Sequence, residues 1–214
     1  MKLKNRLLVV IGSLLFSTAV YADEGRIYIT APTAITAPGS YLLINDVVGT
    51  FDGISIQSSN VKLDLNGFTI SHTGASLGDG VAIYPEYKNI EITNGAITGF
   101  TRHGIFVPGK SAAPRNIKIS GLRISDNSID GISMEGNPGF IIEDCVLSGG
   151  AIGIYTFAAG LVLNNVIGNN SSGGLVAYTN RLGYRSNVFY GNTPDVSGSG
   201  TNLGDNLCSG ALCP

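Results

Sequence analysis

Three ionisable residues stand directly before a glycine at a regular interval, and together they could do acid–base chemistry. Asp79, His103 and Asp130 follow one another at spacings of 24 and 27 residues. A His between two carboxylates has its imidazolium form favoured, and such a group can transfer protons. Arg102 and Asp126 would complete a candidate catalytic cluster of acid, base and cation. Because Asp-Gly is also a common turn pair, these residues could instead serve only to shape a turn.

The same carboxylates offer a second chemistry, because calcium prefers oxygen ligands. Asp79 and Asp130 could supply such ligands from neighbouring repeats, so calcium is the one cofactor that the sequence leaves open. The chain has no Gly-x-Ser-x-Gly nucleophile elbow, no Walker-type phosphate loop and only two His, His72 and His103. Serine-type hydrolysis and nucleotide chemistry therefore have no support.

Aromatic side chains form a second candidate site, this one for binding. Alternation within the apolar runs predicts that Phe106 and Tyr155 point outward, and Tyr84, Phe157 and Tyr178 lie one residue further along their runs. Five residues share these positions: Phe106, Tyr155, Tyr84, Phe157 and Tyr178. An exposed aromatic stripe flanked by polar groups suits stacking against sugar rings. The longer turns at 71–79 and 108–116 could instead cover it, and insertions of this kind often carry binding.

An internal repeat must position all of these residues. A Gly followed by alternating apolar residues occurs six times, at Gly53, Gly80, Gly104, Gly131, Gly153 and Gly174. Each occurrence is followed by a second alternating run, such as NVKLDL, and several by a clear third, such as GFTIS. Three short strands per period, without an apolar stripe at helical spacing, predict one coil of a parallel β-solenoid. No coil can bury its apolar face alone, so the coils must stack.

The bend between the second and third strands has its own repeated residues. Asn94, Asp144, Asn165 and Asn187 recur there. Asn66 and Gly121 stand near it, and Asn and Gly tolerate the left-handed backbone conformation that such a bend needs. Stacked amides can also bond to one another along the column. We therefore expect a structural ladder at this bend.

The coil pattern GI-x-I … N-x-x-I … N, over roughly residues 40–192, resembles the right-handed parallel β-helix superfamily. That group includes pectate lyases, polygalacturonases and repeat domains of secreted carbohydrate-active proteins. The resemblance implies an all-β fold, a single-stranded right-handed parallel β-helix of about six to seven coils. Polygalacturonase-like members carry Gly-His-Gly and Arg-Ile-Lys segments. Here RHG stands at 102–104, Arg-Ile-Lys is missing, and the calcium and Arg motifs of pectate lyases have no full equivalent.

The first 22 residues have the pattern of a secretory signal peptide, which leaves one domain at 23–214. They combine a basic start, the apolar run LLVVIGSLLF and small residues at Val20 and Ala22. Cleavage would remove three of the 13 Lys and Arg and none of the 15 Asp and Glu, moving the net charge from −2 to −5. This acidity argues against nucleic acid or anionic membranes as partners. No later stretch is apolar enough to span a membrane, so we expect a secreted or periplasmic protein.

Three cysteines remain in the mature chain. Cys208 and Cys213 are close together in NLCSGALCP, and in an oxidising compartment we expect them to form a disulfide. Cys145 lies in the apolar run FIIEDCVLS and is expected to be a buried free thiol. No metal site is expected at the terminal pair, because two Cys without a nearby His or further Cys cannot complete a tetrahedral shell.

The sequence supports three functions. The first is a secreted module that binds carbohydrate or polysaccharide through the aromatic residues, without turnover. The second is a polysaccharide lyase or glycoside hydrolase acting on an anionic polysaccharide. In that enzyme His103 or Arg102 would be the base, and Asp79, Asp126 and Asp130 would be acid or calcium ligands. The third is a structural or adhesive envelope protein.

Overall fold

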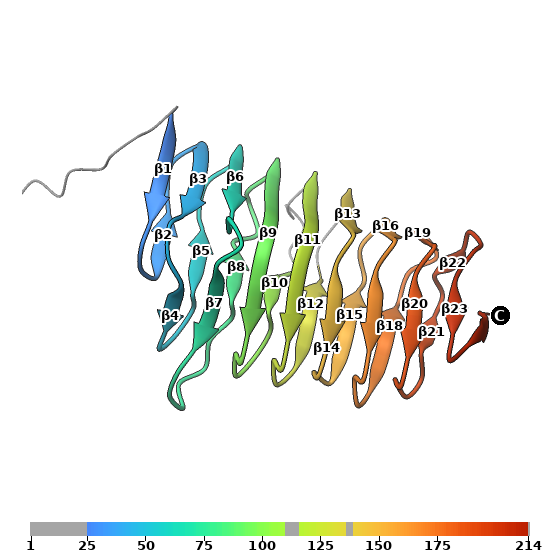
Figure 1. Cartoon of the computed structure of the whole chain (residues 1–214). Coiled ribbons are helices and arrows are strands. Elements are labelled where there is room, and N and C mark those ends of the chain that lie inside the picture. Colours follow the sequence, from blue (N-terminus) through green and yellow to red (C-terminus); the bar gives the residue numbers. More distant parts are fainter. Residues whose placement is uncertain (1–24, 110–115, 136–138, 214) are drawn as a thin grey trace, which may run out of the picture.

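The protein is an elongated stack of β-strands, seen here in a computed structural model that describes residues 25–109, 116–135 and 139–213. The predicted signal peptide lies outside these residues. The rod runs from β1 (Arg26–Ile29) at one end to β23 (Leu207–Cys208) and the C-terminus at the other (Figure 1). Strands pair with their counterparts in the next coil, so the predicted all-β parallel solenoid is confirmed. No helix in the described part of the chain is long and apolar enough to cross a membrane.

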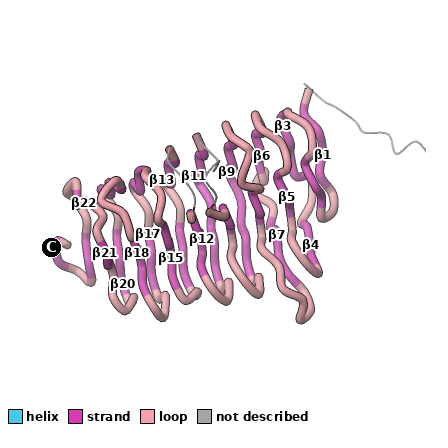
Figure 2. Tube along the Cα trace, turned by 180° about the vertical axis from the view of Figure 1, so that it is seen from behind, coloured by secondary structure: helices cyan, strands magenta, loops and turns pink. Residues whose placement is uncertain are grey.

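One face of the rod is an eight-stranded parallel sheet, several strands of which are labelled in Figure 2. Six of its strands contain or directly follow the six repeat glycines, and the sheet continues by one strand at each end. In order, its strands are β2 (Thr33–Ile35), β5 (Ile54–Ile56), β8 (Val81–Ile83), β10 (Ile105–Val107), β12 (Asp130–Met134), β15 (Ile152–Thr156), β18 (Gly173–Ala177) and β21 (Val196–Gly198).

The second and third strands of the coils form one 16-stranded sheet. It is continuous because β9 (Ile90–Thr98) and β11 (Ile117–Ser125) run unbroken through the bend that divides these strands in the other coils. The remaining strands before the bend are β1 (Arg26–Ile29), β3 (Gly39–Leu43), β6 (Val61–Asp64), β13 (Phe140–Glu143), β16 (Gly160–Leu163), β19 (Leu182–Arg185) and β22 (Thr201–Asn202). Those after it are β4 (Val47–Gly49), β7 (Thr69–His72), β14 (Val146–Ser148), β17 (Val166–Gly168), β20 (Val188–Tyr190), β23 (Leu207–Cys208) and β24 (Ala211–Leu212).

The core is built from columns of inward side chains, one residue from each coil. Ile105, Ile132 and Ile154 are partners in the sheet register, and all three are fully buried. Ile54, at the start of the same column, is also fully buried. Burial of each such side chain is worth about 1.5–3 kcal/mol, so stacking of the coils supplies the main stabilisation.

Close packing explains the glycine that opens each repeat. A Cβ added to Gly104 would lie 2.5 Å from Cγ2 of Ile124 and 2.6 Å from the carbonyl oxygen of Gly131. Gly131 stands in the same relation to Gly153, whose carbonyl oxygen would be 2.7 Å from the added atom. Real Cβ atoms do not approach other atoms so closely, so a side chain cannot be accommodated here. The corner of one coil therefore touches the corner of the next, and this contact fixes the position of the residue that precedes each glycine.

The bend between the second and third strands contains two columns of polar residues, where the sequence predicted one. Asn94, Asp144, Asn164 and Ser186 have the left-handed conformation, with φ between 54° and 60°. Asn165 and Asn187 lie one position later and are buried, so their predicted left-handed conformation was wrong. The predicted amide ladder is present in this buried column. Asn165 Nδ2 donates to Asn187 Oδ1 at 3.0 Å, and Asn187 Nδ2 donates to Asn206 Oδ1 at 3.0 Å.

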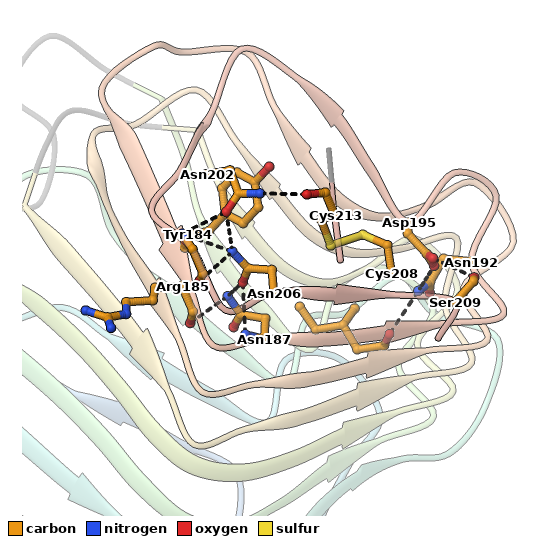
Figure 3. Close-up of a disulfide and its surroundings, with 12 residues drawn as sticks. Tyr184, Arg185, Asn187, Asn192, Asp195, Asn202, Asn206, Cys208, Ser209 and Cys213 are labelled. Atoms are coloured by element: carbon orange, nitrogen blue, oxygen red, sulfur yellow. Dashed lines mark hydrogen bonds between the residues drawn. A yellow bond between two sulfur atoms is a disulfide. The ribbon is translucent and has the colours of Figure 1, made fainter. Parts of the chain in front are cut away.

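The C-terminal end of the rod is closed by the predicted Cys208–Cys213 disulfide. It links β23 to the residue that follows β24, and these two strands are antiparallel. Beside it, Asn202 Nδ2 donates to the carbonyl oxygen of Cys213 at 3.1 Å (Figure 3). Cys145 is free and buried, as predicted, and burial raises the pKa of its thiol to about 11.

Candidate functional site

The repeat brings the predicted acid–base residues together on the eight-stranded sheet. The register places His103, directly before the repeat glycine Gly104, beside Asp130 of β12 on one side and beside Asp79 of the preceding coil on the other. All three side chains are buried, with exposed fractions of 2% for Asp79, 6% for His103 and 4% for Asp130. We call these residues the Asp–His–Asp cluster.

Hydrogen bonds hold the imidazole of His103 in one orientation. Its Nδ1 donates to Asp79 Oδ1 at 2.9 Å, and the main-chain N–H of His103 donates to the same oxygen at 3.0 Å. Its Nε2 lies 3.6 Å from Asp130 Oδ2. Arg102 Nη1 lies 3.4 Å from Asp79 Oδ2, so both oxygens of this carboxylate face a positive or donor group. The ring of His103 is therefore fixed between two carboxylates, as the spacing predicts.

The two carboxyl groups of the cluster lie in different environments. Burial raises the pKa of Asp130 from 3.8 to about 6, although His103 acts in the opposite direction. Asp79 instead accepts two hydrogen bonds from His103 and faces the guanidinium of Arg102. Asp130 is thus a carboxyl group that exchanges its proton close to neutral pH.

Asp126 takes a different position from the one expected of a site residue. It is exposed at the turn after β11, where its φ is 56° and its main-chain N–H donates to the carbonyl oxygen of Ser148 at 3.0 Å. Gly149 and Asn169 are left-handed at the same turn in the next two coils. The residue type at this position thus follows from the backbone conformation, and we leave Asp126 out of the candidate site.

A cavity of about 310 Å³ lies over the first half of the eight-stranded sheet, and it unites the two candidate sites that the sequence suggested separately. Its lining consists of Asp52, Asp79, Ala82, Ile83, Tyr84, Pro85, Arg102, Phe106 and Pro108. The Phe106 ring stacks on His103, with centroids 4.7 Å apart and an interplanar angle of 12°. Arg102 Cζ lies 5.0 Å from the Phe106 centroid. The Asp–His–Asp cluster thus supports one aromatic wall of the cavity.

The cavity lining includes Tyr84, which the sequence predicted to bind, and Asp52, which it did not. Tyr84 is 43% exposed and forms the second aromatic wall, which agrees with its predicted outward position. Asp52 was not predicted as a site residue, although it is the first member of the column that precedes the repeat glycines. Its Oδ1 accepts the main-chain N–H of Asp79 at 2.9 Å. The repeated position directly before each glycine was the sequence signal that could have identified Asp52.

The other three predicted aromatic residues form a separate cluster two coils further along the same face. Tyr155 contacts Phe157 and Tyr178, with ring centroids 5.3 and 5.8 Å apart. Phe157 and Tyr178 stack on each other at 5.1 Å and 23°. Phe157 is 45% exposed and Tyr178 58% exposed, so this cluster offers open ring faces to solvent.

The expected calcium ligands face inward in this structure. Asp79 and Asp130 both point to His103. Among the described residues, no three His, Cys, Asp or Glu side chains are grouped so that they could hold a metal ion. Calcium therefore plays no part in the function that we propose.

Comparisons with known proteins concern the scaffold. A family model described as a right-handed beta helix region matches residues 43–207. Among solved structures, the Dettilon tailspike protein (gp208) aligns at 12% sequence identity with a TM-score of 0.33. The alignment covers 87% of this chain but 60% of that chain, and similarity at this level carries no argument about function. A search of curated proteins found no match.

Proposed function

The chain belongs to the right-handed β-helix family, and we propose that it uses this scaffold to bind a glycan without converting it. The observation that carries the proposal is the cavity over β8 and β10. There the exposed ring of Tyr84 and the ring of Phe106 lie with Arg102 and the carboxylates of Asp52 and Asp79. We call these five residues the first platform.

This combination of groups matches the chemistry of a sugar. The apolar face of a sugar ring packs on an aromatic ring, while its hydroxyl groups need acceptors and donors at the edge. The first platform supplies the partly exposed carboxylate of Asp52 as an acceptor and the guanidinium of Arg102 as a donor. Phe106 is held by His103 on one face, so its orientation is set before a ligand arrives. Such preorganisation lowers the entropy cost of binding.

The burial of the acid–base residues supports binding rather than turnover. A catalytic acid or base must come within hydrogen-bond reach of the reacting atom. Of the Asp–His–Asp cluster, only Asp79 is among the described residues that line the cavity. Both ring nitrogens of His103 are directed at carboxylates. We therefore infer that His103 is a positioning residue for Asp79 and Phe106.

One observation favours an enzyme as the second candidate. Burial raises the pKa of Asp130 to about 6, so this carboxyl group holds its proton to a higher pH than an ordinary Asp does, as a general acid requires. A lyase or hydrolase would need the substrate to reach Asp130, with Asp79 and His103 as partners. In that case Asp130→Asn and His103→Gln would abolish release of reducing ends or unsaturated uronides, with or without calcium.

Secretion into the periplasm or beyond is part of the proposal. A disulfide between Cys208 and Cys213 is typical of an oxidising compartment. The signal-like pattern of residues 1–22 points to the same compartment. A glycan would be encountered there as a wall, capsule or matrix component.

A binding assay with matched variants tests the proposed function. The purified chain is applied to a printed array of neutral, amino and uronate-containing glycans, and hits are measured by calorimetry. We expect Phe106→Ala to weaken binding by about fivefold or more, because a stacked ring contributes roughly 1 kcal/mol or more. Tyr190→Ala is the control, since Tyr190 is 42% exposed but lies on the other sheet.

Three results of this assay are informative. Binding that falls in Phe106→Ala and not in Tyr190→Ala supports the proposal. Release of products that requires Asp130 would replace it with the enzyme. An absence of binding to every glycan would overturn it and leave the rod itself, as a structural or adhesive element, as the function.

A further inference from the structure

The second aromatic cluster, Tyr155, Phe157 and Tyr178, lies on the same outer face as the first platform, and we call it the second platform. The two platforms are built at equivalent positions of the coil. Phe106 pairs with Ser133 in the register of β10 and β12, and Ser133 pairs with Tyr155 in β15. Phe106 and Tyr155 therefore stand in one column, two strands apart.

A second column adds the remaining rings. The main-chain N–H of Tyr84 donates to the last residue of β5, Ile56, at 3.0 Å. Phe157 donates in the same way to Met134, and Tyr178 to Thr156. Each of these residues is thus the first one past a strand of the eight-stranded sheet. Exposed aromatic rings consequently follow a line parallel to the axis of the rod.

The coil between the platforms carries small and polar residues in these columns. Ser133 is fully buried and leaves no ring between Phe106 and Tyr155. Glu135 follows β12 at the position that Tyr84 and Phe157 hold in their own coils, and it is exposed. The outer face of the eight-stranded sheet therefore has an aromatic platform at each end of a polar segment, and this segment can accept hydrogen bonds from hydroxyl groups.

From these positions we propose that both platforms bind one extended chain of uncharged sugars, laid along the axis of the β-helix. This inference rests on the proposed function and deepens it by naming the ligand class. The rings of Phe106 and Tyr155 are two strand spacings apart, and Tyr84 and Phe157 three, or roughly 10 and 14 Å. Tyr178, one strand further along, extends the span from Tyr84 to roughly 19 Å, so a chain of several sugars is needed to reach both platforms.

The charges on this face select against uronates. Asp52 and Glu135 are carboxylates on the path of the ligand. The guanidinium of Arg102 already pairs with Asp79 at 3.4 Å. A chain with one carboxylate per sugar would face these like charges, and the one guanidinium in the described lining of the cavity is already paired, which is unfavourable. An uncharged chain uses the same oxygens as hydrogen-bond acceptors.

A length series separates this inference from the proposed function. Neutral β-glucan, xylan, mannan and N-acetylchito-oligosaccharides of two to eight sugars, with oligogalacturonates of the same lengths, are titrated into the purified full chain. Three proteins are compared, namely wild type, the double variant Phe157→Ala/Tyr178→Ala and the control Tyr190→Ala. Thermal unfolding of each variant checks that it is folded.

We expect the affinity of wild type to rise by about tenfold or more between two and six sugars, because the second platform adds a linked contact. The double variant should lose this gain and keep the affinity for the shortest oligomers. Binding that does not depend on length, or a gain that survives in the double variant, would overturn the inference while leaving the proposed function intact.

Two other outcomes are equally decisive. If uronates bind better than neutral chains, the ligand class is wrong. If the double variant keeps its glycan affinity but differs from wild type in sedimentation, the second platform joins copies of the chain. Failure of all oligomers to bind wild type would instead remove the proposed function itself.

Discussion

At the scale of single residues, the Asp–His–Asp cluster shows how one fold position acquires different properties in successive coils. Asp79, His103 and Asp130 occupy the same corner, yet only Asp79 reaches the cavity surface. Asp130 is desolvated, with a pKa of about 6. The cluster therefore links the protonation of a buried carboxyl group to the side chain that supports Phe106.

We predict that Asp130 makes folding stability depend on pH. Its pKa is higher in the folded protein than the ordinary value of 3.8, so the folded state binds the proton more tightly. The resulting stabilisation is complete below about pH 4 and is lost as the pH rises through 6. Relative to Asp130→Asn, wild type should therefore lose roughly 1–3 kcal/mol of unfolding free energy between pH 4 and 7.

Urea unfolding at pH 4, 5, 6 and 7 measures this difference. Asp126→Asn is a matched control, since Asp126 is exposed at a turn whose left-handed backbone conformation Asn adopts equally well. Its difference from wild type should stay within about 0.5 kcal/mol at every pH. A difference between wild type and Asp130→Asn that does not change with pH would show that Asp130 is ionised at its ordinary pKa.

At the scale of the strand and its turns, the sequence predicted periodicity well and close contacts poorly. Alternation of apolar residues identified the inward column that contains Ile54, Ile105 and Ile132, because period-two burial leaves a direct trace in residue type. The left-handed position was assigned to Asn165 and Asn187, one residue late, because Asn suits both the bend and the buried ladder.

The candidate site was only partly visible for a related reason. Each residue of the Asp–His–Asp cluster could be placed from the repeat spacing. The stacking of His103 on Phe106 could not, because it depends on side-chain direction at a corner rather than on alternation. The sequence therefore suggested an acid–base site and an aromatic site separately, and the first platform emerged only in three dimensions.

We predict that the repeat glycines are required for packing, not for turn conformation. Gly104→Ala should destabilise the protein by about 1–3 kcal/mol, because its Cβ would press on Ile124 and on the carbonyl oxygen of Gly131. Gly200→Ala is the control, since its Cβ would meet Ala177 and Leu182 at ordinary distances of 3.4 and 3.5 Å. Thermal unfolding of both variants compares them. Equal melting temperatures would show that the corner can relax.

A second, exposed amide ladder lies at the turn before the second strand of the coil, where Asn89 Nδ2 donates to Asn60 Oδ1 at 2.8 Å and Asn116 Nδ2 donates to Asn89 Oδ1 at 3.0 Å. The buried ladder should contribute more to the free energy of unfolding than this exposed ladder does. Asn187→Ala removes an acceptor for Asn165 and a donor to the carbonyl oxygen of Val162 at 2.9 Å, all inside the protein. Because these buried groups are left without partners, the substitution should lower the free energy of unfolding by roughly 3 kcal/mol or more. Asn89→Gly removes a link of the exposed ladder and keeps its left-handed backbone, so its cost should be below about 1 kcal/mol.

Chemical unfolding of the two Asn variants tests this ranking. The comparison is direct, because each substitution removes one amide from a column of amides. Similar losses in both variants would mean that water reaches the inner column and replaces the missing partner.

At the scale of the whole molecule, the rod is a one-dimensional stack in which each coil contacts only its neighbours. Sheet partners in the described residues lie in consecutive coils, apart from the antiparallel pair β23 and β24 at the C-terminal end. Stability in such a stack is a sum of coil and interface contributions, and the end coils unfold first unless they are covered. The platforms lie over β8, β10, β15 and β18, between the third and the seventh strands of the eight-stranded sheet, so the sheet continues past them at both ends.

The C-terminal disulfide should therefore act locally. In Cys208→Ser/Cys213→Ser, we expect faster amide hydrogen exchange in β22, β23 and β24 and unchanged exchange in β8 and β10. The disulfide closes a short loop, so its loss should lower the unfolding free energy of the last coil by about 2 kcal/mol. The ladder at Asn206 should weaken with it, because Asn202 and Asn206 pack beside the bridge (Figure 3).

Hydrogen exchange followed by mass spectrometry resolves these segments in one experiment. Dithiothreitol added to wild type should reproduce the exchange pattern of the double variant and should leave the variant itself unchanged. If exchange instead accelerated equally in every coil, the rod would unfold as a single cooperative unit. The disulfide would then stabilise both platforms from the far end of the molecule, and its reduction would weaken glycan binding. A strictly local response means that the redox state of the C-terminus and ligand binding are independent.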